Sequence, residues 1–467
     1  MNIKRFIGDK NFYKKILLIA VPIMIQNGIT NFVSLLDNIM IGKLGTEPMS
    51  GASIVNQLFF IYYLCIFGGM SGAGIFTAQY YGHGDDEGIR HTFRFKFFLG
   101  IIISFSTFAL FTFAGKPLIN MYLKSEPNVQ NAELTLMYGQ KYLKIMLFTL
   151  PAFTLSQTYA STLRECGQTF LPMISGGISV FLNLFLNYVF IYGKLGAPAL
   201  GVEGAAVATV ISRYAEFLII AVVAHKNKAK NTYLTGIYKS FRIPKKLIKS
   251  IFIKGTPLLL NETLWASAIA LISQCYSQRG LNVVAALNIA STINNVFNIA
   301  FIALGDSIAI IVGQYLGANM MDEAKETAYK MIFFSVSVCT IIAAVMAFTS
   351  RLFPRLYNTT AEAKDLAQKF ILLYALFMPQ NAFLHGSYFT LRSGGKTIIT
   401  FLFDSVFAWC VSYSVAFILS RFTEFSAIKM FIIVQSCDLL KCLVGFLLLK
   451  KGIWLNNIIE EKKDRET

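Results

Sequence analysis

Long apolar runs, separated by short polar segments, follow one another along nearly the whole chain. A helix needs about 20 predominantly apolar residues to cross a hydrocarbon core of roughly 30 Å at about 1.5 Å per residue. Twelve stretches meet this requirement: 15–42, 51–81, 95–115, 140–163, 169–192, 204–224, 250–277, 284–315, 328–350, 366–391, 397–420 and 427–450. The pattern therefore predicts an all-α, polytopic membrane protein with 12 transmembrane helices.

The composition supports this prediction and excludes other classes. Apolar residues make up 55% of the 467 residues, charged residues only 14%, and the mean hydropathy is +0.57. A soluble domain carries about 25% charged residues. The net charge of +17 would suggest nucleic acid in a soluble protein, but here the basic residues lie mostly between apolar runs, so we expect no nucleic-acid partner. The seven cysteines form no CxxC pair and do not have the spacing of metal ligands. The sequence contains no GxxxxGK[ST] motif, so we do not expect this chain to use ATP directly.

The distribution of basic residues predicts the topology. An even number of spans places both termini on one side, and that side carries more lysine and arginine, as at Lys4, Arg5, Lys245 and Lys450. By the positive-inside rule both termini are expected to be cytoplasmic. The apolar run that begins at Ile16 is not followed by a small-residue cleavage pattern, so we interpret it as a membrane helix rather than a signal peptide.

The two halves of the chain repeat one another. Five residues recur at one constant offset: Pro22, Gly45, Gln79, Tyr80 and Gly82 are matched by Pro257, Gly280, Gln314, Tyr315 and Gly317. Because six spans separate the copies, the repeats should be parallel and related by a pseudo-two-fold axis along the membrane normal. We predict an N-terminal lobe over 1–224, a basic cytoplasmic linker over 225–249, and a C-terminal lobe with a cytoplasmic tail over 250–467. Transporters built in this way bind substrate between the lobes, near the midplane.

A charged side chain inside a span requires a reason, because it costs about 2.5–3.5 kcal/mol at the bilayer centre. Asp37 shares one face of the first span with Gln26 and Thr30, and no basic residue lies in the interior of that span. A polar stripe of this kind must face protein or water. We predict that Asp37 is the protonatable or cation-binding group and that Gln26 and Thr30 line the substrate cavity. The alternative is an aspartate that only hydrogen-bonds a neighbouring helix.

A second acidic residue, Glu262, lies five residues after Pro257 and is equivalent to Asn27 of the first half. We predict that it is a coupling acid of the second lobe, with a buried glutamate satisfied by local polar groups as the alternative. Four other charged residues lie three apart on single helices and are predicted to form structural ion pairs. They are Arg213 with Glu216 and Asp438 with Lys441.

Three stretches resemble the multidrug and toxic compound extrusion (MATE) family, in its NorM-like branch. They are the run from Pro22 to Gly45, the stretch from Gln79 to Gly82, and the run from Leu182 to Lys194 that is followed by Gly204 to Thr209. The resemblance covers nearly the whole chain. It implies a V-shaped pair of six-helix lobes that alternates between inward- and outward-facing states and exports cationic or amphipathic compounds against an inflow of Na⁺ or H⁺. It further implies a monomer in the lipid of the plasma (inner) membrane, with a small-molecule substrate and no cofactor besides the coupling ion.

The resemblance also implies site residues. It places Asn183, Asn187 and Thr209 around Asp37, and their oxygens suit a hard cation. Many relatives carry an aspartate at the place of Asn187. In the second lobe, the acidic residue that NorM-like members carry in the tenth span, near Glu262, aligns with Asn381. Both departures remove a negative charge, so the choice between Na⁺ and H⁺ stays open at this point.

Two other functions are less consistent with the sequence. A flippase for lipid-linked precursors would need several basic residues facing a central cavity, but only Arg213 and Lys441 lie near the middle of spans. A membrane-embedded transferase would need a polar catalytic constellation, and the loops offer only the acidic turn 85–87 beside Arg90 and His91. We interpret that turn as a solvated or gating turn rather than a metal site. The prediction is a secondary active transporter and not an enzyme.

Overall fold

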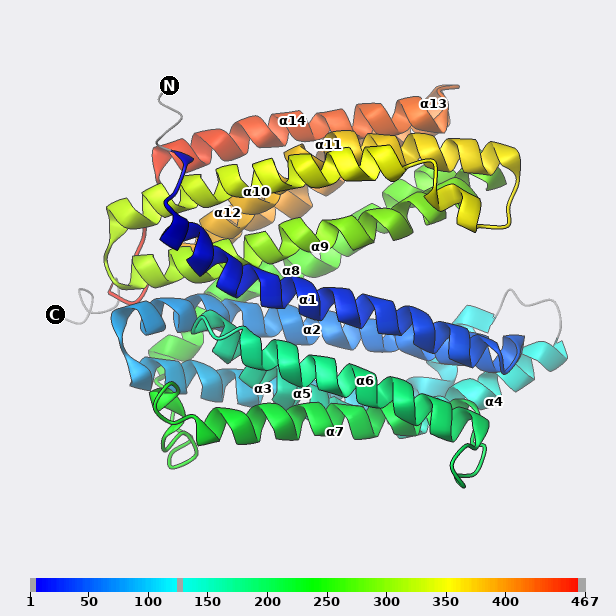
Figure 1. The fold of residues 1–467 in the computed structure, drawn as a ribbon, viewed down its shortest axis with the longest axis horizontal. Coiled ribbons are helices and arrows are strands. Elements are labelled where there is room, and N and C mark those ends of the chain that lie inside the picture. Colours follow the sequence, from blue (N-terminus) through cyan, green and yellow to red (C-terminus); the bar gives the residue numbers. More distant parts are fainter. Residues whose placement is uncertain (1–5, 124–128, 461–467) are drawn as a thin grey trace. The chain divides into compact units, whose positions relative to one another are not determined.

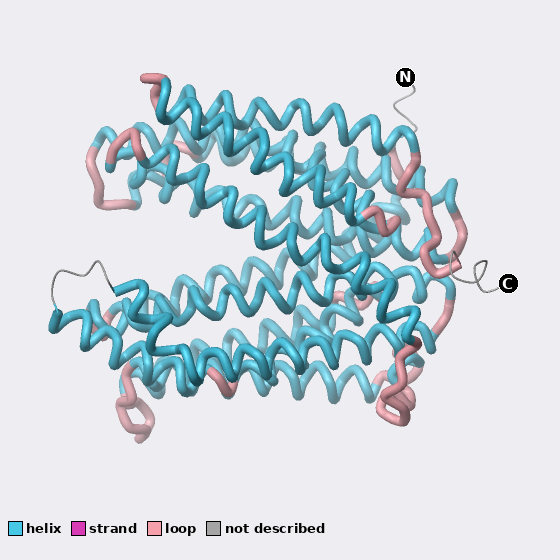
Figure 2. Tube along the Cα trace, turned by 180° about the vertical axis from the view of Figure 1, so that it is seen from behind, coloured by secondary structure: helices cyan, strands magenta, loops and turns pink. Residues whose placement is uncertain are grey.

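The structure is a computed structural model that describes residues 6–123 and 129–460, and in this part of the chain all regular elements are helical (Figures 1 and 2). The α-helices, in order, are α1 (Lys10–Gly42), α2 (Thr46–His83), α3 (Asp86–Leu123), α4 (Val129–Met146), α5 (Thr149–Glu165), α6 (Phe170–Tyr192), α7 (Val202–Lys226), α8 (Lys245–Ser277), α9 (Leu281–Gly317), α10 (Met321–Thr349), α11 (Ala361–Ser393), α12 (Thr397–Phe401), α13 (Ser414–Phe422) and α14 (Ala427–Lys451). Short 3-10 turns lie at Thr232–Leu234 and Phe353–Leu356. Two π-helical segments, Leu402–Val406 and Ala408–Tyr413, connect α12 to α13.

The predicted all-α membrane fold is confirmed. Within the described residues, 10 helices are long and apolar enough to cross a membrane, counting 397–422 as one continuous helix. The other two predicted spans are also helical. The span 140–163 is divided between α4 and α5, which are interrupted at Leu147 and Phe148, and the span 366–391 lies in α11, whose apolar pattern is broken by Pro379 and Gln380.

The chain forms two compact units. The N-unit consists of Ile25–Thr77 and Asp86–Lys249, and the C-unit consists of Met1–Met24, Ala78–Asp85 and Ser250–Thr467. The segment 225–249 therefore lies wholly in the N-unit. The first part of α1 and the last turns of α2 pack with the C-unit, although their sequence belongs to the first half.

Buried hydroxyl groups join three helices of the N-unit. The Tyr62 hydroxyl of α2 hydrogen-bonds to Ser104 Oγ of α3 at 3.0 Å and to Thr154 Oγ1 of α5 at 2.6 Å, and it donates to the Leu150 carbonyl at 2.8 Å. Lipid cannot satisfy polar groups, so such groups inside a membrane protein must find partners within it. The network fixes α2, α3 and α5 around the apolar core that surrounds Tyr62.

The two copies of the repeated glycine motif contact each other in the C-unit. A Cβ atom added to Gly82 would lie 1.9 Å from the Gln314 carbonyl oxygen, and one added to Gly317 would lie 1.9 Å from the Gln79 carbonyl oxygen. The ends of α2 and α9 thus approach each other through the two copies of one motif, and only glycine permits this distance. The Gln79 side chain is fully buried and accepts a hydrogen bond from the Ile458 backbone N–H at 2.9 Å.

Replacing Gly317 by Ala should destabilise the protein, because the added methyl group forces α2 and α9 apart. Overpacking of this kind costs about 1–3 kcal/mol. The measurement is the midpoint of thermal unfolding of the purified transporter in detergent. Gly28→Ala in α1 is the matched control, since a Cβ atom there meets nothing within 4 Å. Equal midpoints for the two variants would contradict the close contact.

Candidate functional site

The four polar residues predicted for the first lobe lie together in the N-unit. Asn187 Nδ2 donates to Asp37 Oδ1 at 2.7 Å. Asn183 Oδ1 lies 3.0 and 3.2 Å from the two Asp37 carboxylate oxygens and accepts from Asn187 Nδ2 at 3.2 Å. Asn183 Nδ2 donates to Thr209 Oγ1 at 3.3 Å, and Thr209 Oγ1 donates to the Ala205 carbonyl at 2.9 Å. The result is a continuous chain of hydrogen bonds from α1 through α6 to α7.

Local sequence explains this arrangement. Asn183 and Asn187 are four residues apart on α6, so both side chains lie on the same face of the helix. Helix α7 packs against α6 (Figure 1), and Gly204 allows the approach, since a Cβ atom there would lie 2.5 Å from the Phe190 carbonyl oxygen. Asn183 is 8% exposed and Asn187 is 1% exposed. These two amides therefore place a buried polar surface beside Asp37.

Asp37 forms no ion pair with a lysine or arginine in the part of the chain that the structure describes. The nearby Arg213 is instead paired with Glu216 at 2.9 Å, as the spacing on α7 predicted, and its guanidinium lies 5.3 Å from the centre of the Phe153 ring. The prediction of a structural Arg213–Glu216 pair is confirmed. Asp37 thus keeps a carboxyl group whose partners are neutral amides.

The two residues predicted to line a substrate cavity lie elsewhere on α1. Thr30 Oγ1 donates to the Gln26 carbonyl at 2.9 Å, and Gln26 lies against α6 at Gly176, where an added Cβ atom would be 3.0 Å from Gln26 Nε2. No hydrogen bond between either side chain and Asp37 is present among the described residues. Their role in substrate binding remains a prediction.

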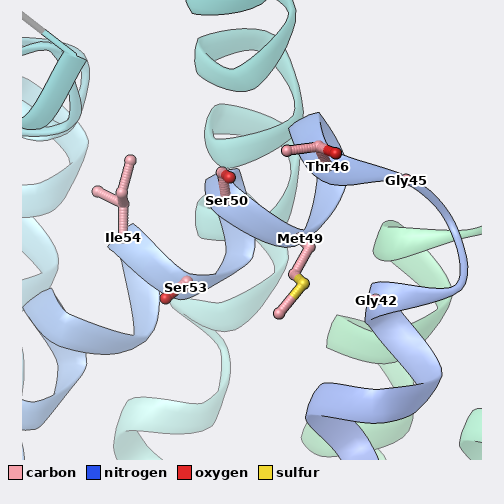
Figure 3. A pocket seen from close by; sticks show the side chains of 7 residues that line it. All are labelled: Gly42, Gly45, Thr46, Met49, Ser50, Ser53 and Ile54. Atoms are coloured by element: carbon pink, nitrogen blue, oxygen red, sulfur yellow. The ribbon is translucent and has the colours of Figure 1, made fainter. Parts of the chain in front are cut away.

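Two of the cavities formed by the described residues lie within the N-unit. One, of about 420 Å³, is formed at the turn between α1 and α2 (Figure 3). Its lining residues are Gly42, Gly45, Thr46, Met49, Ser50, Ser53 and Ile54. The other, of about 370 Å³, is apolar and lies between α3 and α5, with Phe97, Phe105 and Pro151 among its lining residues. Neither cavity includes Gln26, Thr30 or Asp37.

In the C-unit, Glu262 lies on α8 and Asn381 on α11. No hydrogen bond joins them in the described residues. The charged groups whose fields reach Glu262 are Arg392, Asp404 and Asp306. Two acidic groups and one basic group therefore act on Glu262 through their charges. Asn381 forms no hydrogen bond with it in the described residues.

A largely buried ion pair that the sequence did not predict contacts Asn261, the residue that precedes Glu262 in the chain. Lys441 Nζ of α14 donates to Asp404 Oδ1 at 2.6 Å, and Asn261 Nδ2 of α8 donates to Asp404 Oδ2 at 3.1 Å. Asn261 Oδ1 accepts from Ser405 Oγ at 2.7 Å. Asp404 and Ser405 belong to the π-helical segment Leu402–Val406, and π-helical turns are frequent at functional sites.

The predicted pairing of Lys441 with Asp438 is wrong, because Lys441 pairs with Asp404 on another helix. Spacing along one helix identifies which residues of that helix are neighbours. It does not show which charged residue of another helix lies closer. The signal in the sequence was two opposite charges, Asp404 and Lys441, each in the middle of an apolar span. Charges in such positions usually pair with one another.

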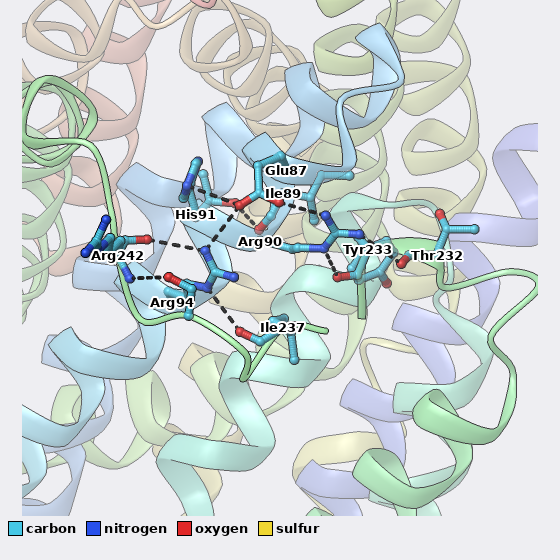
Figure 4. Close-up of polar contacts among 11 residues, drawn as sticks. Glu87, Ile89, Arg90, His91, Arg94, Thr232, Tyr233, Ile237 and Arg242 are labelled. Carbon is cyan, nitrogen blue, oxygen red and sulfur yellow. Dashed lines mark hydrogen bonds and ion pairs between the residues drawn. The ribbon is translucent and has the colours of Figure 1, made fainter. Parts of the chain in front are cut away.

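The acidic turn 85–87 leads into α3, and its Glu87, in the first turn of α3, is held by basic residues of the same helix. Glu87 pairs with Arg90 at 2.7 Å, with His91 at 3.3 Å and with Arg94 at 3.3 Å (Figure 4). The described residues contain no group of three metal-ligating side chains. The geometry gives the Glu87 carboxylate an ion-pairing role.

Comparison with known proteins relates this geometry to a family. The MatE family model matches the chain twice, over residues 22–189 and 257–418. The matches begin at Pro22 and Pro257, the first members of the two sets of repeated residues. The probable multidrug resistance protein NorM of Thermotoga maritima is 25% identical over 460 residues, which cover 94% of this chain and 93% of that protein. The probable multidrug resistance protein YoeA of Bacillus subtilis is 26% identical over 425 residues, 88% of each chain.

Solved structures have the same fold. One is the outward-facing conformation of a multidrug resistance MATE family transporter of the MOP superfamily, with a TM-score of 0.81 at 19% identity, covering 97% of this chain and 98% of that one. Another is a mutant form of the Vibrio cholerae MATE transporter VcmN, with a TM-score of 0.83 at 17% identity, covering 96% of this chain and 98% of that one. Because the family model matches most of both halves, the chain belongs to the MatE family and is a multi-pass membrane transporter rather than an enzyme.

Proposed function

We propose that this transporter is a proton-coupled antiporter that exports cationic or amphipathic organic compounds by alternating access, with Asp37 as the coupling acid. The relatives named multidrug resistance proteins support the substrate class. The observation that carries the proposal is the chain of hydrogen bonds that ends on Asp37. We further propose that both termini are cytoplasmic, that the protein acts as a monomer in the inner membrane, and that Glu262 is a second acid of the cycle.

Protonation of Asp37 would supply a donor for the oxygen of the Asn183 amide. The orientation of an asparagine amide is inferred from its hydrogen bonds. A protonated Asp37 donates its proton to Asn183 Oδ1, which lies 3.0 Å from Asp37 Oδ2, and accepts from Asn187 Nδ2 at 2.7 Å. Asn183 Nδ2 then remains directed at Thr209 Oγ1. In this orientation the contacts with Asp37 and with Thr209 Oγ1 join donors to acceptors, and Asn183 Nδ2 also lies 3.3 Å from the Thr209 backbone nitrogen.

An ionised Asp37 requires a different arrangement. The Asn183 amide must turn over so that its nitrogen faces the carboxylate, which places that nitrogen 3.2 Å from Asn187 Nδ2. Two donors then face each other in a buried site, where an unsatisfied polar contact is costly. Loss of the proton therefore changes both the charge of the site and its hydrogen bonding. This is the differential interaction that coupling requires.

The exchange cycle follows from the charge on Asp37. An ionised carboxylate in a low-dielectric environment attracts a cationic substrate much more strongly than it would in water. Protonation on the opposite side of the membrane removes that charge and lowers the affinity, so the cation leaves. Because the proton and the substrate compete for one carboxyl group, the two are bound alternately. Inward movement of protons therefore drives outward movement of substrate.

Sodium coupling is the second candidate. Asn187 Oδ1 is buried without a hydrogen-bond partner among the described residues, and a buried oxygen beside a carboxylate is a suitable ligand for a hard cation. The flippase alternative is disfavoured, because Arg213 is paired with Glu216 and Lys441 with Asp404. Neither basic group is available for a polyanionic head group. A transferase is excluded by membership of a transporter family.

Proteoliposomes separate the two coupling ions. An acidic lumen with equal sodium on both sides should drive ethidium into the vesicles, and a one-unit pH difference should give up to about tenfold accumulation for one-for-one exchange. A sodium gradient at equal pH should leave the dye at its equilibrium level. Accumulation of ethidium driven by a sodium gradient alone would show that the coupling ion is Na⁺ and not H⁺. If neither gradient drives accumulation, the protein is not an antiporter of this kind.

A further inference from the structure

The segment between α7 and α8 carries a concentrated positive charge. Residues 226–249 contain eight basic side chains and no acidic one. All eight are exposed: Lys226, Lys228, Lys230, Lys239, Arg242, Lys245, Lys246 and Lys249. Because α7 and α8 are both candidate membrane spans, the segment lies at a membrane surface. We refer to residues 226–249 as the basic loop.

The basic loop is held in a defined conformation. Arg90 Nε donates to the Tyr233 carbonyl at 3.0 Å, and Arg94 Nε donates to the Ile237 carbonyl at 3.1 Å (Figure 4). Tyr233 and Ile237 are each 1% exposed. The arginines of α3 thus fix the backbone of the loop, while the apolar side chains of the loop fill the space against the N-unit. The eight cations are presented from a rigid support rather than from a free linker.

Glu87, which lies beside the two arginines that hold the loop, is paired within its own helix. The Glu87 carboxylate is occupied by Arg90, His91 and Arg94 of its own helix. Its charge is therefore balanced within α3. The exposed surface of the basic loop keeps its positive field.

Aromatic side chains place the loop at the level of the lipid headgroups. Phe241 is 52% exposed and packs edge-on against Phe98 of α3, with 5.8 Å between the ring centres. Tyr238 is 46% exposed, and its hydroxyl is hydrogen-bonded to that of Tyr159. Exposed aromatic rings of this kind are enriched at membrane interfaces. Basic groups beside rings at such an interface are within reach of lipid phosphates.

We propose that the basic loop binds the headgroups of anionic phospholipids. The matching chemistry is a phosphodiester headgroup with net negative charge, such as that of phosphatidylglycerol. Clusters of four to eight basic residues beside a transmembrane helix bind anionic lipid through additive electrostatic attraction. Rigid presentation by Arg90 and Arg94 reduces the ordering that binding would otherwise require.

Binding of phosphatidylglycerol to the purified full-length transporter, followed by native mass spectrometry, tests this proposal. The loop variant combines Lys228→Gln, Lys230→Gln, Lys239→Gln and Lys249→Gln. The control variant combines four exposed residues at other sites, Lys116→Gln, Lys194→Gln, Arg351→Gln and Arg355→Gln. The loop variant should bind phosphatidylglycerol at least about tenfold more weakly than wild type, and the control variant should bind as wild type does.

Three further arms define the outcome. Wild-type binding should weaken as sodium chloride is raised, because salt screens attraction between exposed charges. Phosphatidylcholine should bind both variants and wild type equally. Excess inorganic phosphate should leave most of the lipid bound. Equal loss in the two variants, salt-independent binding, or displacement by inorganic phosphate alone would each overturn the proposal.

Discussion

Replacing Asp37 by Asn should reduce export of a fluorescent cationic dye to the level of cells that lack the transporter. Asparagine can still donate to and accept from Asn183 and Asn187, so the variant should fold. It cannot change its charge, however, and the competition between proton and cation for one carboxyl group is lost. The measurement is the rate of ethidium efflux from energised cells, normalised to the amount of transporter in the membrane fraction.

A matched control for this substitution lies on the surface of α11. Asp365 is exposed and pairs with Lys369 one turn away, an arrangement that contributes at most about 1 kcal/mol. Asp365→Asn should therefore transport at the wild-type rate. Wild-type efflux by Asp37→Asn at normal membrane abundance would remove Asp37 from the coupling mechanism. A variant that is absent from the membrane would be studied as purified protein by dye exchange in proteoliposomes.

Much of the fold could be predicted from the sequence, because the bilayer restricts the solutions. Apolar runs of spanning length indicated the twelve helical segments, and the constant offset between repeated residues indicated the duplication that the family model also finds. The interruption at Leu147 and Phe148 was not predictable, since both residues are apolar and do not disturb the run. The contact between the Gln79 side chain and the Ile458 backbone was not predictable either, because hydropathy does not identify the partner of a buried amide.

The candidate site was predictable to different degrees in the two halves. Around Asp37 the predicted amides lie within hydrogen-bond distance, because Asn183 and Asn187 share one face of α6 and Gly204 brings α7 close. In the second half, the interior charges were visible in the sequence but their pairing was not. Spacing along α14 indicated Asp438 as the partner of Lys441, whereas the choice of Asp404 depends on how α14 packs against the π-helical segment.

Removing one charge of the Asp404–Lys441 pair should destabilise the protein more than any other substitution named above. Lys441→Gln leaves the Asp404 carboxylate buried without its counter-charge, and loss of one partner of a buried pair costs about 3–5 kcal/mol. Asp404→Asn leaves the lysine ammonium in the same condition, although the asparagine oxygen can still accept the hydrogen bond from Asn261. The midpoint of thermal unfolding in detergent measures each effect.

The double variant Asp404→Asn/Lys441→Gln distinguishes the ion pair from simple packing. It leaves neither charge alone, so it should be more stable than either single variant, with a coupling energy of about 0.5–3 kcal/mol in the double-mutant cycle. Glu326→Gln and Lys330→Gln provide the control, since that pair lies on one face of α10 with Glu326 more than half exposed and should contribute under about 1 kcal/mol. Additive losses at Asp404 and Lys441 would show that the two charges do not stabilise each other. If the double variant regains the unfolding midpoint that the single variants lose, yet still fails to export dye, the ion pair takes part in the transport cycle. Its contribution to stability alone would then not explain why two charges lie in the membrane interior.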